Sequence, residues 1–493
     1  MTGSCPATLP EVLAARAGTV GQALRGSPWW ALSLVSFGFL LLQILLTDHH
    51  RLLEYDEAQY LSQVLPDAIA TGLGPHRSRG IIYLIAPAAM SGADLSLVRV
   101  YLSVVSAGGL ALAFGTWIPL IGQRAAVAAG ILGTSWISLF YGSEIQPNFF
   151  VALAGVAIAG LIAGPGPAHR FVSWPLLLWS AAAAALRPTD AGVVLASMLG
   201  FTLIRRKAAA ARTFITAMVG ALIGMLPWLV ESYARFGGPV QRLAAARAPV
   251  GQGVTFRLLE HLAILDGPLI GPDRSGGTSL LALGWWLALG LLGVVGVRKA
   301  AKTAGVMVSF VGATATAVFY FTQVGATAPR FLLPAYALIA IPASVGLAEV
   351  WRRAEHPAWR SLVLMGLAPL VLWNLAMVGQ IDDEQIRARQ ASEIVGSAIS
   401  SEAKGAPCVF FSQYAYPQIQ VESGCEGYAI SLDQLNSGHP PERLVERSRS
   451  GRLVYVVMVS PTEAGSFVDG MSCNPVEGSP WTMCRVGSQL PEP

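Results

Sequence analysis

Charge is scarce in this sequence. Only 13% of the 493 residues are charged, and lysine occurs only at positions 207, 299, 302 and 404. A soluble domain typically carries about 25% charged residues, whereas 53% of this chain is hydrophobic. This composition excludes a disordered chain and a standard cytosolic enzyme, and indicates a polytopic membrane protein. The net charge of +4 is small and contains no basic block, so we expect no nucleic-acid partner.

Signatures of nucleotide and metal chemistry are also missing. The chain has no internal repeat, no Walker or dinucleotide-binding loop and no zinc-ligand spacing. We therefore expect no cofactor, and a divalent cation held by acidic side chains is the one alternative left open.

Apolar runs predict about eleven transmembrane helices, since each crossing needs about 20 mainly apolar residues. They lie near 29–47, 97–118, 125–141, 148–164, 171–186, 189–204, 213–234, 278–297, 303–322, 331–349 and 361–379. The first run lacks a small-residue cleavage site, so we interpret it as a retained anchor after a cytoplasmic tail, 1–28. Residues 29–379 form the predicted membrane domain, with large outer loops at 48–96 and 236–277.

Loop charge sets the predicted orientation. With the N-terminus inside, the inner segments hold far more arginine and lysine than acid, as the positive-inside rule requires. An odd number of spans then places the C-terminus outside. Scarce lysine with abundant alanine is typical of a GC-rich bacterial genome, so we expect a bacterial plasma membrane.

The tail, 380–493, is predicted to form a small extracytoplasmic α/β domain, with a helix at 386–400 and strands at 409–411, 453–459 and 481–486. It contains four cysteines, Cys408, Cys425, Cys473 and Cys484, and the fifth, Cys5, lies on the inner side. An even set in the tail predicts disulfides in an oxidising compartment. Three pairings are possible, of which the nearest, Cys408–Cys425 and Cys473–Cys484, are favoured; four free thiols are the alternative.

Charged residues gather at the outer ends of the predicted spans, where such groups indicate function. The stretches are 54–57, 75–80, 143–148, 187–190 and 328–331. In three of them a proline, Pro147, Pro188 or Pro329, stands at or just before a helix start, and helix N-termini favour anions. The basic residues beside them predict a phosphate or pyrophosphate site; they are Arg77, Arg79, Arg187 and Arg330. The alternatives are arginines that snorkel to the interface and acids that cap helices.

An acidic pair after the first span, in a long outer loop, resembles the GT-C superfamily of polyprenyl-phosphate-sugar-dependent glycosyltransferases across roughly 29–350. Three stretches resemble the branch of Alg9-type and GPI mannosyltransferases: Tyr55-Asp56-Glu57, Arg77-Ser78 with Pro87, and Arg330-Phe331-Leu332-Leu333-Pro334. Two positions depart from that branch. Glu54-Tyr55 replaces its His-Pro, and Thr327-Ala328-Pro329 lacks its His-Lys-Glu.

The resemblance implies an inverting transfer at the outer membrane face, from a polyprenyl-phosphate sugar to a glycan, lipid or protein acceptor. It implies that Asp56 is the base and that Glu57 orients Asp56 or the acceptor, with exchangeable roles. The four arginines would bind the donor phosphate, and the sugar or acceptor would contact Tyr55, His76, Glu144 and Asp190. A cation held by Asp56, Glu57 and Glu144 stays open.

Two other functions compete with this interpretation. A ligase or polymerase that uses a pyrophosphate-linked glycan would share the outer arginines but does not need the early acidic pair. A transporter or flippase would place ionisable residues in mid-membrane, whereas here they collect at one interface. We therefore expect an all-α GT-C-like membrane protein, N-in and C-out, with a small α/β tail domain.

Overall fold

The computed structural model describes residues 27–66, 68–164, 173–205, 210–247, 256–267, 269, 278–300, 304–431, 434, 441–459 and 471–486. The predicted tail 1–28 lies outside these residues except for its last two. The chain divides into two compact units. The first contains Met1–Thr47, Ser103–Gly142 and Pro147–Val378, and the second contains Asp48–Leu102, Ser143–Gln146 and Gly379–Pro493.

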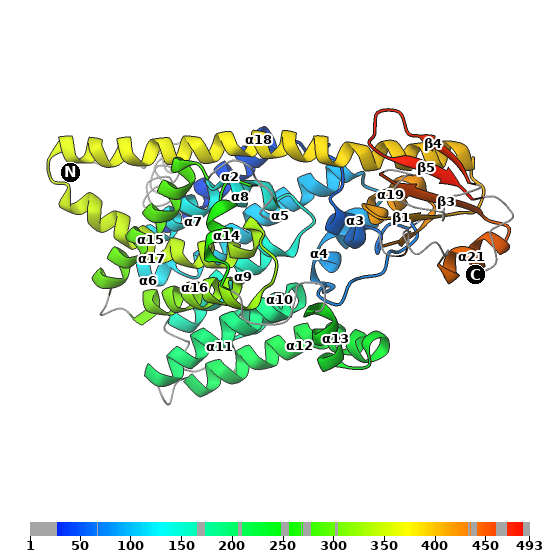
Figure 1. Cartoon of the computed structure of the whole chain (residues 1–493). Helices are drawn as coiled ribbons and strands as arrows, with labels where there is room; N and C mark the ends of the chain where they lie inside the picture. Colours follow the sequence, from blue (N-terminus) through cyan, green and yellow to red (C-terminus); the bar gives the residue numbers. More distant parts are fainter. Residues whose placement is uncertain are drawn as a thin grey trace, which may run out of the picture. The chain divides into compact units, whose positions relative to one another are not determined.

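The first unit is built of helices (Figure 1). Its elements are α2 (Pro28–Leu46), α6 (Ile118–Ile121), α7 (Arg124–Gly133), α8 (Trp136–Tyr141), α9 (Pro147–Ala163), α10 (Trp174–Leu186), α11 (Pro188–Arg205), α12 (Ala210–Phe236), α13 (Pro239–Arg247), α14 (Leu258–Ala263), α15 (Leu280–Lys299), α16 (Ala304–Gln323), the 3-10 helix η2 (Pro329–Leu332) and α17 (Leu333–Arg353). Two further helices, α5 (Leu95–Gly115) and α18 (Pro357–Ala403), contribute residues to both units.

Each predicted span contains a helix, and the chain is an integral membrane protein. Within the described residues, seven helices are long and apolar enough to cross a membrane; they are α2, α5, α12, α15, α16, α17 and α18. The predicted spans 148–164, 171–186 and 189–204 hold shorter apolar helices, and 125–141 is divided between α7 and α8. The number of spans and their orientation therefore stay predictions.

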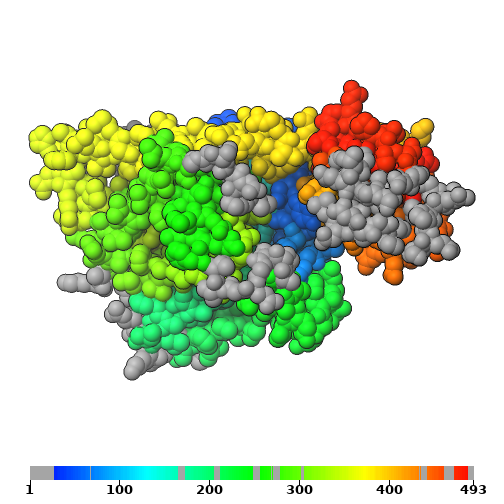
Figure 2. All heavy atoms as spheres, viewed as in Figure 1, coloured from blue at the N-terminus to red at the C-terminus, as the bar shows by residue number. Residues whose placement is uncertain are grey.

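Glycines allow some of these helices to pack closely. A Cβ added to Gly224 of α12 would lie 1.9 Å from the carbonyl oxygen of Ala181 in α10, and one added to Gly296 of α15 would lie 1.8 Å from that of Pro342 in α17. Close backbone approach through small residues is how membrane helices gain packing energy without a hydrophobic driving force. In contrast, α12 turns apolar side chains such as Ile215 and Val230 outward, and its spheres lie at the surface in Figure 2. Such a face suits contact with lipid.

The second unit combines the loop after α2 with the tail (Figure 1). Its elements are α3 (Tyr55–Leu61), α4 (Gly80–Ala89), α19 (Tyr416–Ser423), α21 (Glu442–Arg449) and five strands, β1 (Cys408–Ser412), β2 (Glu426–Ala429), β3 (Leu453–Met458), β4 (Ser472–Pro475) and β5 (Thr482–Arg485). The sheet order is β2-β1-β3-β5-β4. Strand β1 runs parallel to β2 and β3, whereas β5 is antiparallel to β3 and β4. The predicted α/β tail domain is confirmed.

Both faces of this sheet are covered. Alternate side chains point to opposite faces of a strand, so Val409 and Phe411 enter one core cluster while Phe410 enters the other. Val395 and Ile399 of α18 pack in the same cluster as Phe410. The structure contains two disulfides, Cys408–Cys425 and Cys473–Cys484, which are the nearest-neighbour pairings.

Helix α18 differs from the sequence-based expectation. The predicted span 361–379 and the predicted tail helix 386–400 are one element of 47 residues. Neither proline nor a turn signal lies between the two stretches, and the polar residues from Asp382 to Arg389 continue the helical pattern instead of ending it.

Candidate active site

Helix α3 carries the predicted catalytic pair and has a well-formed N-terminus. Glu54 accepts a hydrogen bond from the backbone N–H of Asp56 at 2.9 Å, and the Glu54 N–H donates to Glu57 at 3.0 Å. This reciprocal capping box and the acids of the first turn favour a helix start at this point. Consecutive helical residues face different directions, so Asp56 and Glu57 have different surroundings.

Asp56 is the more accessible of the two carboxylates. Its side chain is 18% exposed and forms an ion pair with Arg77. Burial lowers the pKa of Arg77, but Asp56 and Tyr60 raise it more, so that its pKa lies above the ordinary value and the guanidinium stays charged. The Arg77 guanidinium also lies over the Tyr55 ring, 5.7 Å from its centroid. The structure therefore brings the predicted Tyr55, Asp56 and Arg77 together.

Glu57, by comparison, is completely buried. Its Oε2 lies 2.7 Å from Arg99 and 3.3 Å from Arg389, and neither the Glu57 nor the Arg99 side chain is exposed. Its Oε1 accepts from the backbone N–H of Ile145 at 2.9 Å. These contacts fix the buried side of α3. They suit a residue that orients its neighbour Asp56.

Glu144 belongs to the same buried network. It lies 2.6 Å from Arg51 and 3.5 Å from Arg389, and Arg51 also lies 3.6 Å from Asp382. Burial raises the pKa of Glu57 more than Arg99 lowers it, so its pKa is above the ordinary value. Burial raises the pKa of Glu144 too, but Arg389 and Arg51 lower it more, and its pKa is well below the ordinary value.

Sequence reasoning missed three members of this network, Arg51, Arg389 and Asp382, and assigned none of them a role. One signal was available for the tail helix. Asp382 and Arg389 are seven residues apart, and this spacing places two opposite charges on one face of a helix. In the structure both side chains are buried.

A second cluster lies within the first unit. Arg187 ends α10 immediately before Pro188 begins α11, and its Nε lies 3.1 Å from Asp190. The Tyr320 hydroxyl donates to Asp190 at 2.6 Å. Sequence reasoning did not identify Tyr320.

Phe331 joins the predicted Arg187 and Arg330 in this cluster. The two guanidinium groups lie 5.6 and 5.7 Å from the centroid of its ring, and Tyr320 stacks on the same ring at 5.2 Å. Two of the four predicted phosphate ligands therefore lie together. The other two, Arg77 and Arg79, belong to the second unit, where Arg79 precedes α4 and the predicted His76 is exposed.

The three acids predicted to lie at the site, Asp56, Glu57 and Glu144, are each paired with an arginine. Asp56 contacts Arg77, Glu57 contacts Arg99, and Glu144 contacts Arg51. Among the described residues, no group of three or more His, Cys, Asp or Glu side chains is placed to hold a metal ion. Each of these three carboxylates therefore has a guanidinium as a neighbour, and the cation site that the sequence left open stays a prediction to be tested.

No protein-family model and no curated protein sequence matches the chain. Its fold is nevertheless similar to solved structures along most of its length. ArnT from Cupriavidus metallidurans bound to undecaprenyl phosphate matches with a TM-score of 0.63 and 13% identity, covering 93% of this chain and 99% of ArnT.

Two other structures extend the comparison. The Archaeoglobus fulgidus oligosaccharyltransferase matches with a TM-score of 0.51 and 13% identity over 87% of this chain and 69% of its own. Arabinofuranosyltransferase AftD from mycobacteria matches with a TM-score of 0.52 and 13% identity over 92% of this chain and 40% of its own. At such identities the likeness concerns the fold alone. The chain therefore has the fold of GT-C membrane glycosyltransferases.

Proposed function

We propose that the protein is an inverting glycosyltransferase that moves a sugar from a polyprenyl-phosphate donor to an acceptor in the cell envelope. One observation carries this proposal: α3 presents a partly exposed Asp56 next to a completely buried Glu57. A general base must be accessible to the substrate, as Asp56 is, whereas the buried Glu57 needs only to hold α3 in position. The fold similarity to ArnT bound to undecaprenyl phosphate supports a lipid-phosphate donor.

In the proposed reaction Asp56 removes the proton of the acceptor hydroxyl. The hydroxyl oxygen bonds to the anomeric carbon of the sugar while the bond from that carbon to the phosphate oxygen breaks. The polyprenyl phosphate leaves with the bonding electron pair, and the proton stays on Asp56. Arg77, which contacts Asp56, keeps the carboxylate oriented.

The donor phosphate is proposed to bind Arg187 and Arg330. Fixed cations stabilise the charge that grows on a leaving phosphate, and Phe331 holds these two guanidinium groups near one another. Asp190 already contacts Arg187 and Tyr320, so we propose that it orients Arg187. Glu144, deep in the arginine network, is proposed to have the corresponding role for Arg51.

The proposed location is the outer face of a bacterial plasma membrane. The two disulfides of the tail domain support an oxidising compartment. Mannose or another monosaccharide is the proposed sugar, and a glycan, lipid or protein is the proposed acceptor.

Sugar transfer in membranes from radiolabelled polyprenyl-phosphate monosaccharides, beginning with mannose and arabinofuranose, tests the proposal. We expect transfer from one donor by the natural protein and a loss of about a hundredfold or more in Asp56→Asn, which is the range of general-base catalysis. Asp383→Asn is the matched control, because Asp383 is an exposed carboxylate of the same unit. Full activity in Asp56→Asn would remove the base from the proposal. Turnover that requires a pyrophosphate-linked oligosaccharide would favour the ligase alternative.

A further inference from the structure

Tyr416 of the tail domain makes two contacts with helix α3. The Tyr416 ring packs edge-on against the Tyr55 ring, with centroids 5.8 Å apart and an interplanar angle of 85°. Its hydroxyl accepts a hydrogen bond from Gln59 at 3.2 Å. Tyr55 and Gln59 are four residues apart, so they occupy one face of α3, on either side of Asp56 in the sequence.

Two glutamines of α19 add to this contact. With its amide oxygen turned toward Tyr55, Gln418 accepts from the Tyr55 backbone N–H at 3.1 Å, an N–H in the first turn that has no partner within the helix. Gln420 donates to the carbonyl oxygen of Ile69, in the loop that follows α3. Helix α19 therefore contacts both the start of α3 and the segment beyond its end.

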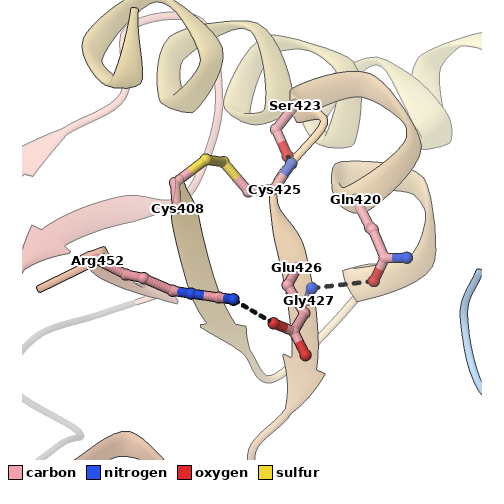
Figure 3. The surroundings of a disulfide bond; sticks show 7 residues. All are labelled: Cys408, Gln420, Ser423, Cys425, Glu426, Gly427 and Arg452. Carbon is pink, nitrogen blue, oxygen red and sulfur yellow. Dashed lines mark hydrogen bonds and ion pairs between the residues drawn. A yellow bond between two sulfur atoms is a disulfide. The ribbon is translucent and has the colours of Figure 1, made fainter. Parts of the chain in front are cut away.

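Helix α19 is itself fixed at both ends. It begins after Ala415, whose φ of 53° is a left-handed conformation that a residue with a Cβ adopts only when its surroundings hold it there. It ends two residues before Cys425, and the disulfide to Cys408 joins that end to the first residue of β1, as Figure 3 shows. In the same view Gln420 accepts from the Gly427 N–H at 2.9 Å and Arg452 donates to Glu426 at 2.7 Å. These bonds connect α19 to β2 and β2 to β3.

We propose that Tyr416 is a positioning residue for Asp56, and that the Cys408–Cys425 disulfide keeps α19 where Tyr416 can act. The tail domain then contributes a residue that positions the proposed base. This inference rests on the proposed function, since it concerns the geometry of the base. Tyr416 does not take part in proton transfer; it fixes the face of α3 that determines where the Asp56 carboxylate lies.

Three variants separate positioning from simple folding. Tyr416→Ala should lower kcat about tenfold or more while the KM for the donor stays within about twofold, since a misplaced base slows chemistry more than binding. Tyr416→Phe keeps the ring contact and loses the hydroxyl that accepts from Gln59, so it should recover most of the rate. Tyr414→Ala is the matched control, because Tyr414 is two residues away and 51% exposed. Unchanged kcat in a folded Tyr416→Ala protein would overturn the proposal.

A second measurement does not depend on turnover. Hydrogen exchange followed by mass spectrometry should show faster exchange of the α3 amides in Tyr416→Ala and unchanged exchange in Tyr414→Ala. If the natural protein transfers no sugar, the proposed function fails, but the exchange result still decides whether Tyr416 fixes α3. Equal protection of α3 in both variants would overturn the positioning role even in an active enzyme.

The disulfide is tested against the other one in the same domain. The double variant Cys408→Ser with Cys425→Ser should lose activity and α3 protection as Tyr416→Ala does. The double variant Cys473→Ser with Cys484→Ser removes a bond between β4 and β5 and leaves the disulfide at the end of α19 intact, so it should retain both activity and protection of α3. Equal losses in the two double variants would show a general effect on the domain and contradict the specific role.

Discussion

Glu57 and Arg99 form an ion pair at 2.7 Å in which neither side chain is exposed. Removing one partner of a buried pair leaves the other charged and unpaired, which costs about 3–5 kcal/mol. Arg99→Met should therefore destabilise the protein strongly, and Arg389→Met, which removes a second cation from Glu57, should have the same direction.

The matched control for this prediction is Arg387→Met, because Arg387 is exposed and lies two residues before the buried Arg389. Thermal unfolding of the purified protein in detergent measures the three variants together. Similar midpoints for Arg387→Met and Arg389→Met would show that the network contributes little to stability.

The shifted pKa values of Glu57 and Glu144 predict how the stability of the fold depends on pH. Glu144 has a lowered pKa in the folded protein, so its contribution is present above the unfolded value of 4.5 and is lost as the pH falls below it. Glu57 has a raised pKa, so its contribution is present below 4.5 and is lost as the pH rises through the folded pKa. Glu57→Gln should flatten the decline on the alkaline side, and Glu144→Gln the decline on the acid side. Unfolding midpoints measured from about pH 2 to 8 check both slopes, and identical pH profiles for the natural protein and the variants would contradict the assignment.

The cluster around Phe331 predicts a defect in donor use. Arg187→Ala and Arg330→Ala should each reduce kcat/KM for the lipid-linked donor about tenfold or more, because each removes a fixed cation from the leaving phosphate. Arg187→Lys should recover little, since a lysine ammonium cannot reproduce the planar guanidinium at Asp190 and over the Phe331 ring. Arg124→Ala, an exposed arginine of the same unit, is the control. Normal donor kinetics in both alanine variants would place the phosphate elsewhere.

Because the three acidic side chains are each paired with an arginine, we expect sugar transfer to need no divalent cation. Asp56, Glu57 and Glu144 each contact a guanidinium, and a metal ion would have to displace it. Activity in membranes should persist after treatment with EDTA and should not rise with added Mg²⁺ or Mn²⁺. Restoration by one of these metals of an activity that EDTA had abolished would show that a cation site exists despite this geometry.

Local patterns in the sequence predicted much of the fold. Apolar runs located the helices because burial in lipid leaves a strong signal, and the strands of the tail were visible as short runs such as Leu453–Met458. Helix α18 was divided wrongly because its apolar and polar halves differ in composition while its backbone continues unbroken.

The candidate site was predicted less completely, for a physical reason. Asp56 and Arg77, which form an ion pair, were both candidates from the sequence because they stand in one loop with a recognisable order of residue types. Arg389 was missed because its contact with Glu57 spans 332 positions, and no local pattern records which distant charge neutralises a buried acid. The contacts of Tyr416 with Tyr55 and Gln59 were missed in the same way, since a tyrosine in the tail has no sequence periodicity that predicts contact with α3.

Those long separations affect how the protein is made. Glu57 meets Arg389 across 332 positions, and Gln59 meets Tyr416 across 357. At a synthesis rate of about 5–20 residues per second, α3 leaves the ribosome roughly 15 to 70 seconds before those partners exist. During that interval helix α3 lacks these contacts from the tail. On the proposed positioning of Asp56 by Tyr416, a chain interrupted before residue 416 would contain Asp56 but lack the contact that aligns it, and sugar transfer would require a completed chain.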